Sequence, residues 1–177
     1  MTGRAKRNPK WFEKEWGSTH PHVGFVTHAR EFLNVVDLIK IRHETMLNKE
    51  FFENKYFSPG YYLMCHAIEL GLKSYLVQHG YTLEELRKKP FGHNLCSILA
   101  ETEKCGIDSS FVAPSLHSAI VYLNDLYMGK MFEYRGKPGI IRLGEWPCVK
   151  IMRDDIQRLL HLLNDCYRAD SIAEKEV

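Results

Sequence analysis

The chain has 177 residues, of which 45% are hydrophobic and 12% aromatic, so it can bury the core of one folded domain and does not belong to the disordered class. Its formal net charge of +2 is too small to indicate nucleic-acid binding by itself. The sequence contains no apolar run of about 20 residues, no signal-peptide pattern and no CxxC pair among its five cysteines, so we expect a reduced, cytoplasmic protein without a membrane span.

Residues 1–20 are predicted to form a polar arm ahead of the folded domain. Within residues 1–17, five basic residues outnumber two acidic ones, and three aromatic residues interrupt the charge: Trp11, Phe12 and Trp16. Basic and aromatic residues together can bind the backbone and bases of a nucleic acid. We favour the alternative, in which these aromatic side chains pack on the domain that follows.

The first predicted helix covers about 22–48. Its hydrophobic residues recur at steps of three or four, which is typical of an amphipathic helix, and they are Phe25, Ala29, Phe32, Val36, Ile39 and Met46. Ser58-Pro59 is a typical helix start and Gly80 a typical helix end, so a second helix is predicted between them.

A capping box of Thr82 and Glu85 predicts a short helix that Pro90 stops. Three longer helices follow, at about 93–105, from Pro114 to Tyr134, and at about 154–168. The segment EYRGKPGIIRLGEWPCVK lies between the last two and contains three glycines and two prolines, so it is predicted to be irregular or to form a small hairpin from IIRL and CVKI.

The elements together predict an all-α protein. We expect a single up-and-down bundle of four to five helices over residues 21–170, followed by a C-terminal tail at 171–177.

The second predicted helix carries an ionisable stripe. At 100° per residue, His66, Glu69 and Lys73 share one side, whereas apolar residues cover most of the others. A helix that is apolar almost all round is usually the centre of a bundle. Glu69 and Lys73 are four residues apart in the favourable order for an ion pair.

Two chemical interpretations of the stripe are less favoured. A di-iron bundle needs Glu-x-x-His on two helices, whereas this helix has His-x-x-Glu and no second copy exists. His20, His22 and His28 lack a fourth zinc ligand at a usual spacing, so we expect no metal. General acid–base chemistry is open to His66 and Glu69, whose spacing lets them touch.

We favour a structural interpretation of the stripe. His93 comes at the start of the third long helix, after a short connection, and can reach a side chain on the second helix. We therefore predict that His66, Glu69, Lys73 and His93 form an internal polar network that fixes how the two helices meet.

These residues also form a family pattern. The run YYLMCHAIELGLKSYLVQHG followed by FGHNLCSILAE resembles the HEPN domains, which are helical bundles named for nucleotide binding. Glu69, Lys73, Gly80 and the Gly-His-x-Leu segment at 92–95 match the family pattern, and FEYRGKP is similar to the Arg-Tyr-Pro segment that often follows the fourth helix. The best match covers about 58–135 and extends, with the flanking helices, over about 22–168.

The resemblance implies one possible activity. Many HEPN proteins are metal-independent RNases of toxin–antitoxin or phage-defence systems, in which an Arg and a His separated by four to six residues meet at a dimer interface. The only match to that spacing is Arg87 and His93, which are the candidate catalytic residues. Lys88 follows the Arg where the family has Asn, Asp or His, and Pro90 and Gly92 place the segment in a loop.

The resemblance also implies a non-catalytic role, which we favour. Other HEPN-like proteins bind nucleotides or RNA, form homodimers, or act beside nucleotidyltransferase-like partners. A basic, Gly- and Pro-rich segment can approach a phosphate closely, and its candidate ligand-binding residues are Tyr134, Arg135, Lys137 and Arg142. A purely structural interaction protein, with no cofactor and no chemistry, is the third alternative.

Overall fold

The computed structural model describes residues 21–47, 57–132 and 146–173, and every regular element in these ranges is a helix. The α-helices are α2 (Pro21–Leu47), α3 (Phe57–Gln78), α4 (Leu83–Arg87), α5 (Leu95–Lys104), α6 (Pro114–Met128) and α7 (Val149–Ala173), with a 3-10 turn at Ser109–Phe111. The prediction of an all-α bundle is confirmed. None of the described helices is both long enough and apolar enough to cross a membrane.

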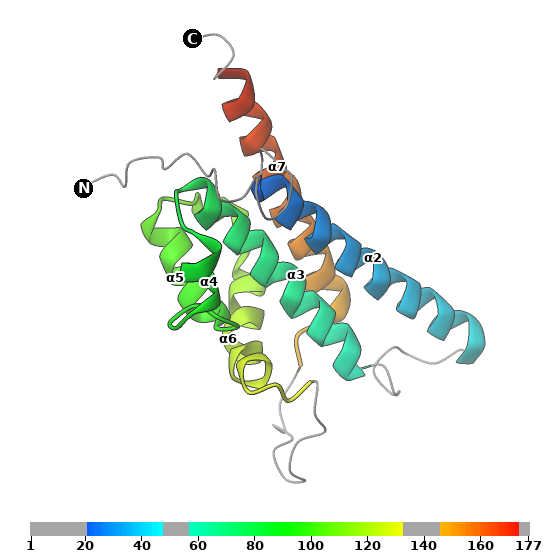
Figure 1. Cartoon of the computed structure of the whole chain (residues 1–177). Coiled ribbons are helices and arrows are strands. Elements are labelled where there is room, and N and C mark those ends of the chain that lie inside the picture. Colours follow the sequence, from blue (N-terminus) through cyan, green and yellow to red (C-terminus); the bar gives the residue numbers. More distant parts are fainter. Residues whose placement is uncertain (1–20, 48–56, 133–145, 174–177) are drawn as a thin grey trace.

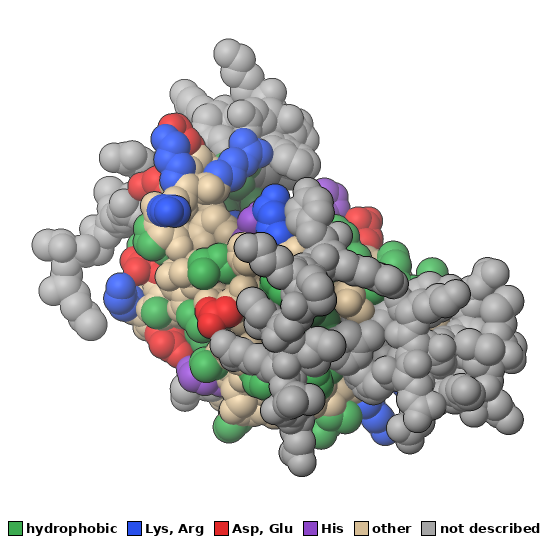
Figure 2. Space-filling model, turned by 90° about the horizontal axis from the view of Figure 1, so that it is seen from below, with side chains coloured by type: hydrophobic (Ala, Val, Ile, Leu, Met, Phe, Trp, Pro, Cys, Tyr) green, Lys and Arg blue, Asp and Glu red, His purple; other side chains and the backbone are tan. Residues whose placement is uncertain are grey.

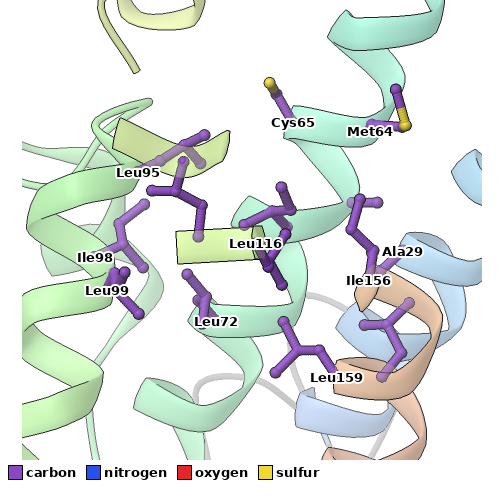
Figure 3. Close-up of a cluster of buried hydrophobic side chains, with 14 of the residues drawn as sticks. Ala29, Met64, Cys65, Leu72, Leu95, Ile98, Leu99, Leu116, Ile156 and Leu159 are labelled. Atoms are coloured by element: carbon purple, nitrogen blue, oxygen red, sulfur yellow. The ribbon is translucent and has the colours of Figure 1, made fainter. Parts of the chain in front are cut away.

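Helix α3 lies at the centre of the bundle and contacts α2, α5, α6 and α7. Helices α2 and α3 run antiparallel along one side, with α7 behind them and α4 and α5 on the other side of α3 (Figure 1). Side chains from α5 and α7 point toward α3 from opposite directions in the core (Figure 3). The predicted central helix is apolar almost all round because its neighbours cover it from several sides.

Close packing of α3 against α7 depends on a small residue. A Cβ added to Gly71 would lie 2.9 Å from Cδ2 of the buried Leu160. A larger residue would therefore force that side chain to shift within a filled core.

The connection between α3 and α5 begins as the sequence predicted. Thr82 accepts a hydrogen bond from the backbone N–H of Glu85, whose side chain accepts one from the N–H of Thr82, so the capping box is present. Asn94, rather than His93, caps α5 by accepting from the backbone N–H of Ser97. The His93 side chain is therefore available for contacts with other elements.

Two predicted boundaries near the end of the bundle were wrong. Helix α6 ends at Met128 rather than at Tyr134, because Lys130 adopts a φ of 57° and the N–H of Met131 bonds back to the carbonyl of Leu126. This left-handed turn satisfies carbonyls of the last helical turn and stops the helix.

The second mistaken boundary is the start of the last helix. CVKI does not form a hairpin strand, because Val149 begins α7, five residues before the predicted start. Val149, Met152 and Ile156 are buried at helical spacing, so burial continues the face of α7 through this segment. IIRL lies outside the described residues.

Candidate functional site

A buried ion pair lies on the central helix. Glu69 and Lys73 are only 4% and 6% exposed, and the Lys73 ammonium donates to Glu69 Oε1 at 2.6 Å. Removing two charges from water carries a large desolvation cost, which is tolerated only when further hydrogen bonds satisfy both groups. The residues around the pair supply such bonds.

The Glu69 carboxylate accepts hydrogen bonds from three side chains. Besides Lys73, the Tyr127 hydroxyl donates to Oε2 at 2.6 Å and His93 Nδ1 contacts the same oxygen at 2.9 Å. His66 Nδ1 lies 2.8 Å from the Tyr127 hydroxyl. Since that hydroxyl gives its one proton to Glu69, His66 donates through Nδ1, and His93 must also donate because an ionised carboxylate only accepts. Both imidazoles thus carry a proton on Nδ1.

Lys73 also holds the loop before α5. Its ammonium donates to the carbonyl of Gly92 at 2.7 Å. Gly92 has a φ of 43°, which favours glycine, and the N–H groups of Phe91 and Gly92 both bond to the carbonyl of Lys88. The compact turn directs the Gly92 carbonyl to α3, so the α4–α5 connection is tied to the central helix.

The network shifts the acidity of its members. Burial alone would raise the pKa of Glu69, but the positive charge of Lys73 and the hydrogen bonds from Lys73, Tyr127 and His93 lower it below the usual value. Burial and the neighbouring Glu69 carboxylate raise the pKa of Tyr127. At neutral pH Glu69 is therefore a carboxylate and Tyr127 a neutral phenol.

A cleft opens beside this network, between α2, α3 and α4. Its volume is about 320 Å³, and its walls are mostly apolar side chains: Pro21, Phe25, Leu70, Leu83 and Leu86. Glu69 and Lys73 line it from α3, His28 from α2 and Arg87 from the end of α4. Gly24 also lines the cleft, and a Cβ added there would meet no atom within 4 Å. The cleft is thus apolar, with buried charged groups at its base and exposed ones at its mouth.

The structure brings together the four residues of the predicted polar network: His66, Glu69, Lys73 and His93. The two candidate catalytic residues are placed differently. Arg87 lines the cleft, whereas His93, with its side chain 46% exposed, hydrogen-bonds Glu69 directly. The candidate ligand-binding residues Tyr134, Arg135, Lys137 and Arg142 lie outside the described residues.

Sequence reasoning missed Tyr127 and the cleft. Tyr127 follows the apolar residues Leu116, Ile120 and Leu123 at helical spacing on α6, and nothing in that spacing distinguishes a tyrosine whose hydroxyl reaches a charge from one that only packs. The cleft depends on the spacing between α4 and α2, which cannot be predicted from the hydrophobic periodicity or the capping residues of either helix. The smallness of Gly24 on an amphipathic helix was the one available signal.

The described residues contain no cluster of three or more His, Cys, Asp or Glu side chains that could hold a metal. His22 and His28 belong to α2, and His20 is outside the described ranges. Comparisons with protein-family models, with curated proteins and with solved structures found no match for this chain.

Proposed function

We propose that this chain is a non-catalytic, HEPN-like module that binds a nucleotide. The observation that carries the proposal is the cleft between α2, α3 and α4. Ligand sites are typically concave, of roughly 300–1,000 Å³, mostly apolar, with a few converging polar groups. The cleft meets each criterion with its volume of about 320 Å³, its apolar walls and its charged residues at two levels. The family resemblance supplies the nucleotide as the class of ligand.

The charges around the cleft favour an anionic ligand. The charges of Glu69 and Lys73 compensate each other, because the two groups are in direct contact. Arg87 is exposed, and its guanidinium forms no ion pair within the described part of the chain. The uncompensated charge beside the cleft is therefore positive, and a guanidinium is well suited to bind phosphate.

The described side chains on one face of the molecule give weaker support for binding a long RNA. On the face seen from below, the coloured Lys and Arg side chains are interspersed with acidic and hydrophobic ones (Figure 2). A protein that follows an RNA backbone usually presents a positive groove along several phosphates. The proposal accordingly rests on the cleft, which has room for one nucleotide.

The test is to fill the cleft without disturbing the fold. Gly24→Met places a side chain where no atom lies within 4 Å, and it replaces a helical glycine with a better helix former. Asn34→Met is the matched control, because Asn34 is exposed on the same helix and does not line the cleft. Calorimetric titration with the four ribonucleoside 5′-monophosphates should show binding by the parent and the control and none by Gly24→Met. Equal binding by all three proteins, or binding by none, would refute the proposal.

A second candidate function is metal-independent RNA cleavage by a dimer. The observation that favours it is the orientation of His93, whose Nδ1 bonds to Glu69 while the half-exposed ring leaves Nε2 to act as a base. A carboxylate that orients an imidazole in this way is typical of general-base catalysis. This function also needs Arg87, which lines the cleft.

The two candidate functions differ in an RNA cleavage assay. Labelled mixed-sequence RNA is incubated with the parent and with His93→Asn, whose amide can still donate to Glu69 but offers no basic nitrogen. We expect neither protein to cleave. Cleavage by the parent that is lost in His93→Asn would establish the second candidate instead.

The remaining parts of the proposal follow from the sequence alone. The scattered cysteines favour a place in the cytoplasm, and the family resemblance implies a homodimer, or a nucleotidyltransferase-like partner, in a toxin–antitoxin or defence-type system. A purely structural interaction role is the outcome if the cleft binds no nucleotide.

A further inference from the structure

The base of the cleft offers a hydrogen-bond donor beside an acceptor. An ammonium has three N–H donors, and Lys73 uses two of them, on Glu69 Oε1 and on the Gly92 carbonyl. The third has no partner within the described part of the chain, although the side chain is buried and lines the cleft. Glu69, next to it, also lines the cleft. Its Oε1 retains acceptor capacity, because among the described residues it accepts from Lys73 alone, whereas Tyr127 and His93 contact Oε2.

The mouth of the cleft differs in charge from its base. At the base, the Lys73 ammonium is already paired with a carboxylate, so a phosphate placed there would face Glu69 and would lose its hydration in an apolar pocket. At the mouth, Arg87 is exposed and unpaired within the described residues. The charge distribution thus favours an uncharged polar edge inside and an anion outside.

From this arrangement we infer that the cleft binds a single nucleotide with its base inward and its phosphate at Arg87. The flat ring would lie between the apolar walls, which include Phe25 and Leu70. Every nucleobase presents an adjacent donor and acceptor on its pairing edge, so the acceptor can bond to Lys73 and the donor to Glu69. One guanidinium matches one phosphate group, either on a free nucleoside monophosphate or at the end of an RNA.

This inference rests on the proposed function and adds the orientation of the ligand. The orientation predicts that the phosphate and Arg87 are energetically coupled, whereas the base and Arg87 are not. Removing the guanidinium from the protein or the phosphate from the ligand should remove the same contribution to the binding free energy. A double-mutant cycle, with one change in the protein and one in the ligand, measures this coupling. Arg87 is suitable for such a cycle because it is exposed at the end of α4 and has no structural ion pair in the described residues.

The experiment compares uridine with uridine 5′-monophosphate, and adenosine with adenosine 5′-monophosphate, on the parent and on Arg87→Gln. Lys89→Gln is the control, because Lys89 is an exposed cation close by that does not line the cleft. A charge-assisted hydrogen bond corresponds to roughly tenfold or more in affinity. We expect the phosphate to strengthen binding by about that factor in the parent and in Lys89→Gln, and to add almost nothing in Arg87→Gln, while nucleoside affinity is unchanged.

The base edge is tested with ligands that lack its donor. We expect 3-methyluridine and N6,N6-dimethyladenosine to bind the parent at least tenfold more weakly than uridine and adenosine. A 5′-phosphorylated trinucleotide is compared with the monophosphate to decide whether the ligand is the end of an RNA or a free nucleotide. Stronger binding of the trinucleotide indicates an RNA end, and stronger binding of the monophosphate indicates a free nucleotide. Either result supports the inference.

The experiments distinguish a wrong orientation of the ligand from a wrong proposed function. Nucleotide binding that Gly24→Met blocks, but that shows no coupling between the phosphate and Arg87 or no effect of base methylation, overturns the orientation alone. Absence of any nucleotide binding overturns both.

Discussion

Glu69→Gln is expected to be strongly destabilising, because it leaves a buried ammonium without its counter-charge. Lys73 is only 6% exposed and its ammonium lies 2.6 Å from the carboxylate, so water would compensate poorly for the lost counter-charge. Breaking a buried ion pair by removing one member costs about 3–5 kcal/mol. A domain is stable by only about 5–15 kcal/mol, so this one atom change would remove a large share of its stability.

The hydrogen bonds around Glu69 are a second reason to expect a large loss of stability in Glu69→Gln. The glutamine amide can accept through one oxygen, whereas the carboxylate accepts from Lys73, Tyr127 and His93 through two. Its amide nitrogen would face one of these donors instead of accepting from it. Since each kcal/mol shifts the melting temperature of a chain of this size by about 2–4 °C, the expected fall is roughly 6–20 °C.

Glu84→Gln is the matched control. Glu84 and Lys88 also form an ion pair four residues apart, but both side chains are exposed. Exposed pairs contribute little to stability because solvent screens them, so urea denaturation should show no measurable change for this variant. The comparison keeps the chemical change and the spacing constant, and it varies the burial together with the hydrogen bonds that Glu69 accepts from Tyr127 and His93.

A double variant tests whether the unpaired charge causes the loss of stability. Glu69→Leu with Lys73→Met removes both charges. We expect it to be more stable than Glu69→Leu alone or Lys73→Met alone, because no buried charge remains unpaired. The reasoning would be refuted if Glu69→Gln changed the urea midpoint no more than Glu84→Gln did, or if the two single changes were simply additive.

The remaining predictions concern stability and are checked by urea denaturation. Because the pKa of Glu69 is lowered in the folded state, its contribution to the free energy of unfolding is fully present above about pH 4.3 and is lost as the pH falls through the folded pKa. The parent should therefore lose more stability on acidification than Glu69→Gln. An equal loss in both proteins would contradict the lowered pKa of Glu69. Asn94→Ala, which removes the cap of α5, should cost about 1 kcal/mol, and Asn94→Asp should restore most of it; equal midpoints for all three would exclude a capping role. Gly24→Ala should stabilise the protein by about 0.5–1 kcal/mol, because alanine is the better helix former. Gly71→Ala should lack this gain, because its Cβ would approach Leu160. An equal gain at both sites would show that α3 and α7 pack less closely than described.

The helices followed from local patterns in the sequence. The apolar repeats, the Ser-Pro start of α3 and the Thr82–Glu85 capping box act between residues a few positions apart, so reading them needs no knowledge of the fold. Where a boundary was misplaced, the deciding contact was a turn closed by Lys130 or the burial of Val149 against other helices.

The charged pair on an otherwise apolar helix was also evident from the residues, and the Gly-His segment indicated the loop that meets it. In contrast, the hydrogen bond from Tyr127 of α6 to Glu69 and the cleft between α2, α3 and α4 became evident only in the folded chain. A buried carboxylate accepts from whichever donors packing brings within about 3 Å. Packing is a property of all the helices together, whereas periodicity and capping are properties of each one alone.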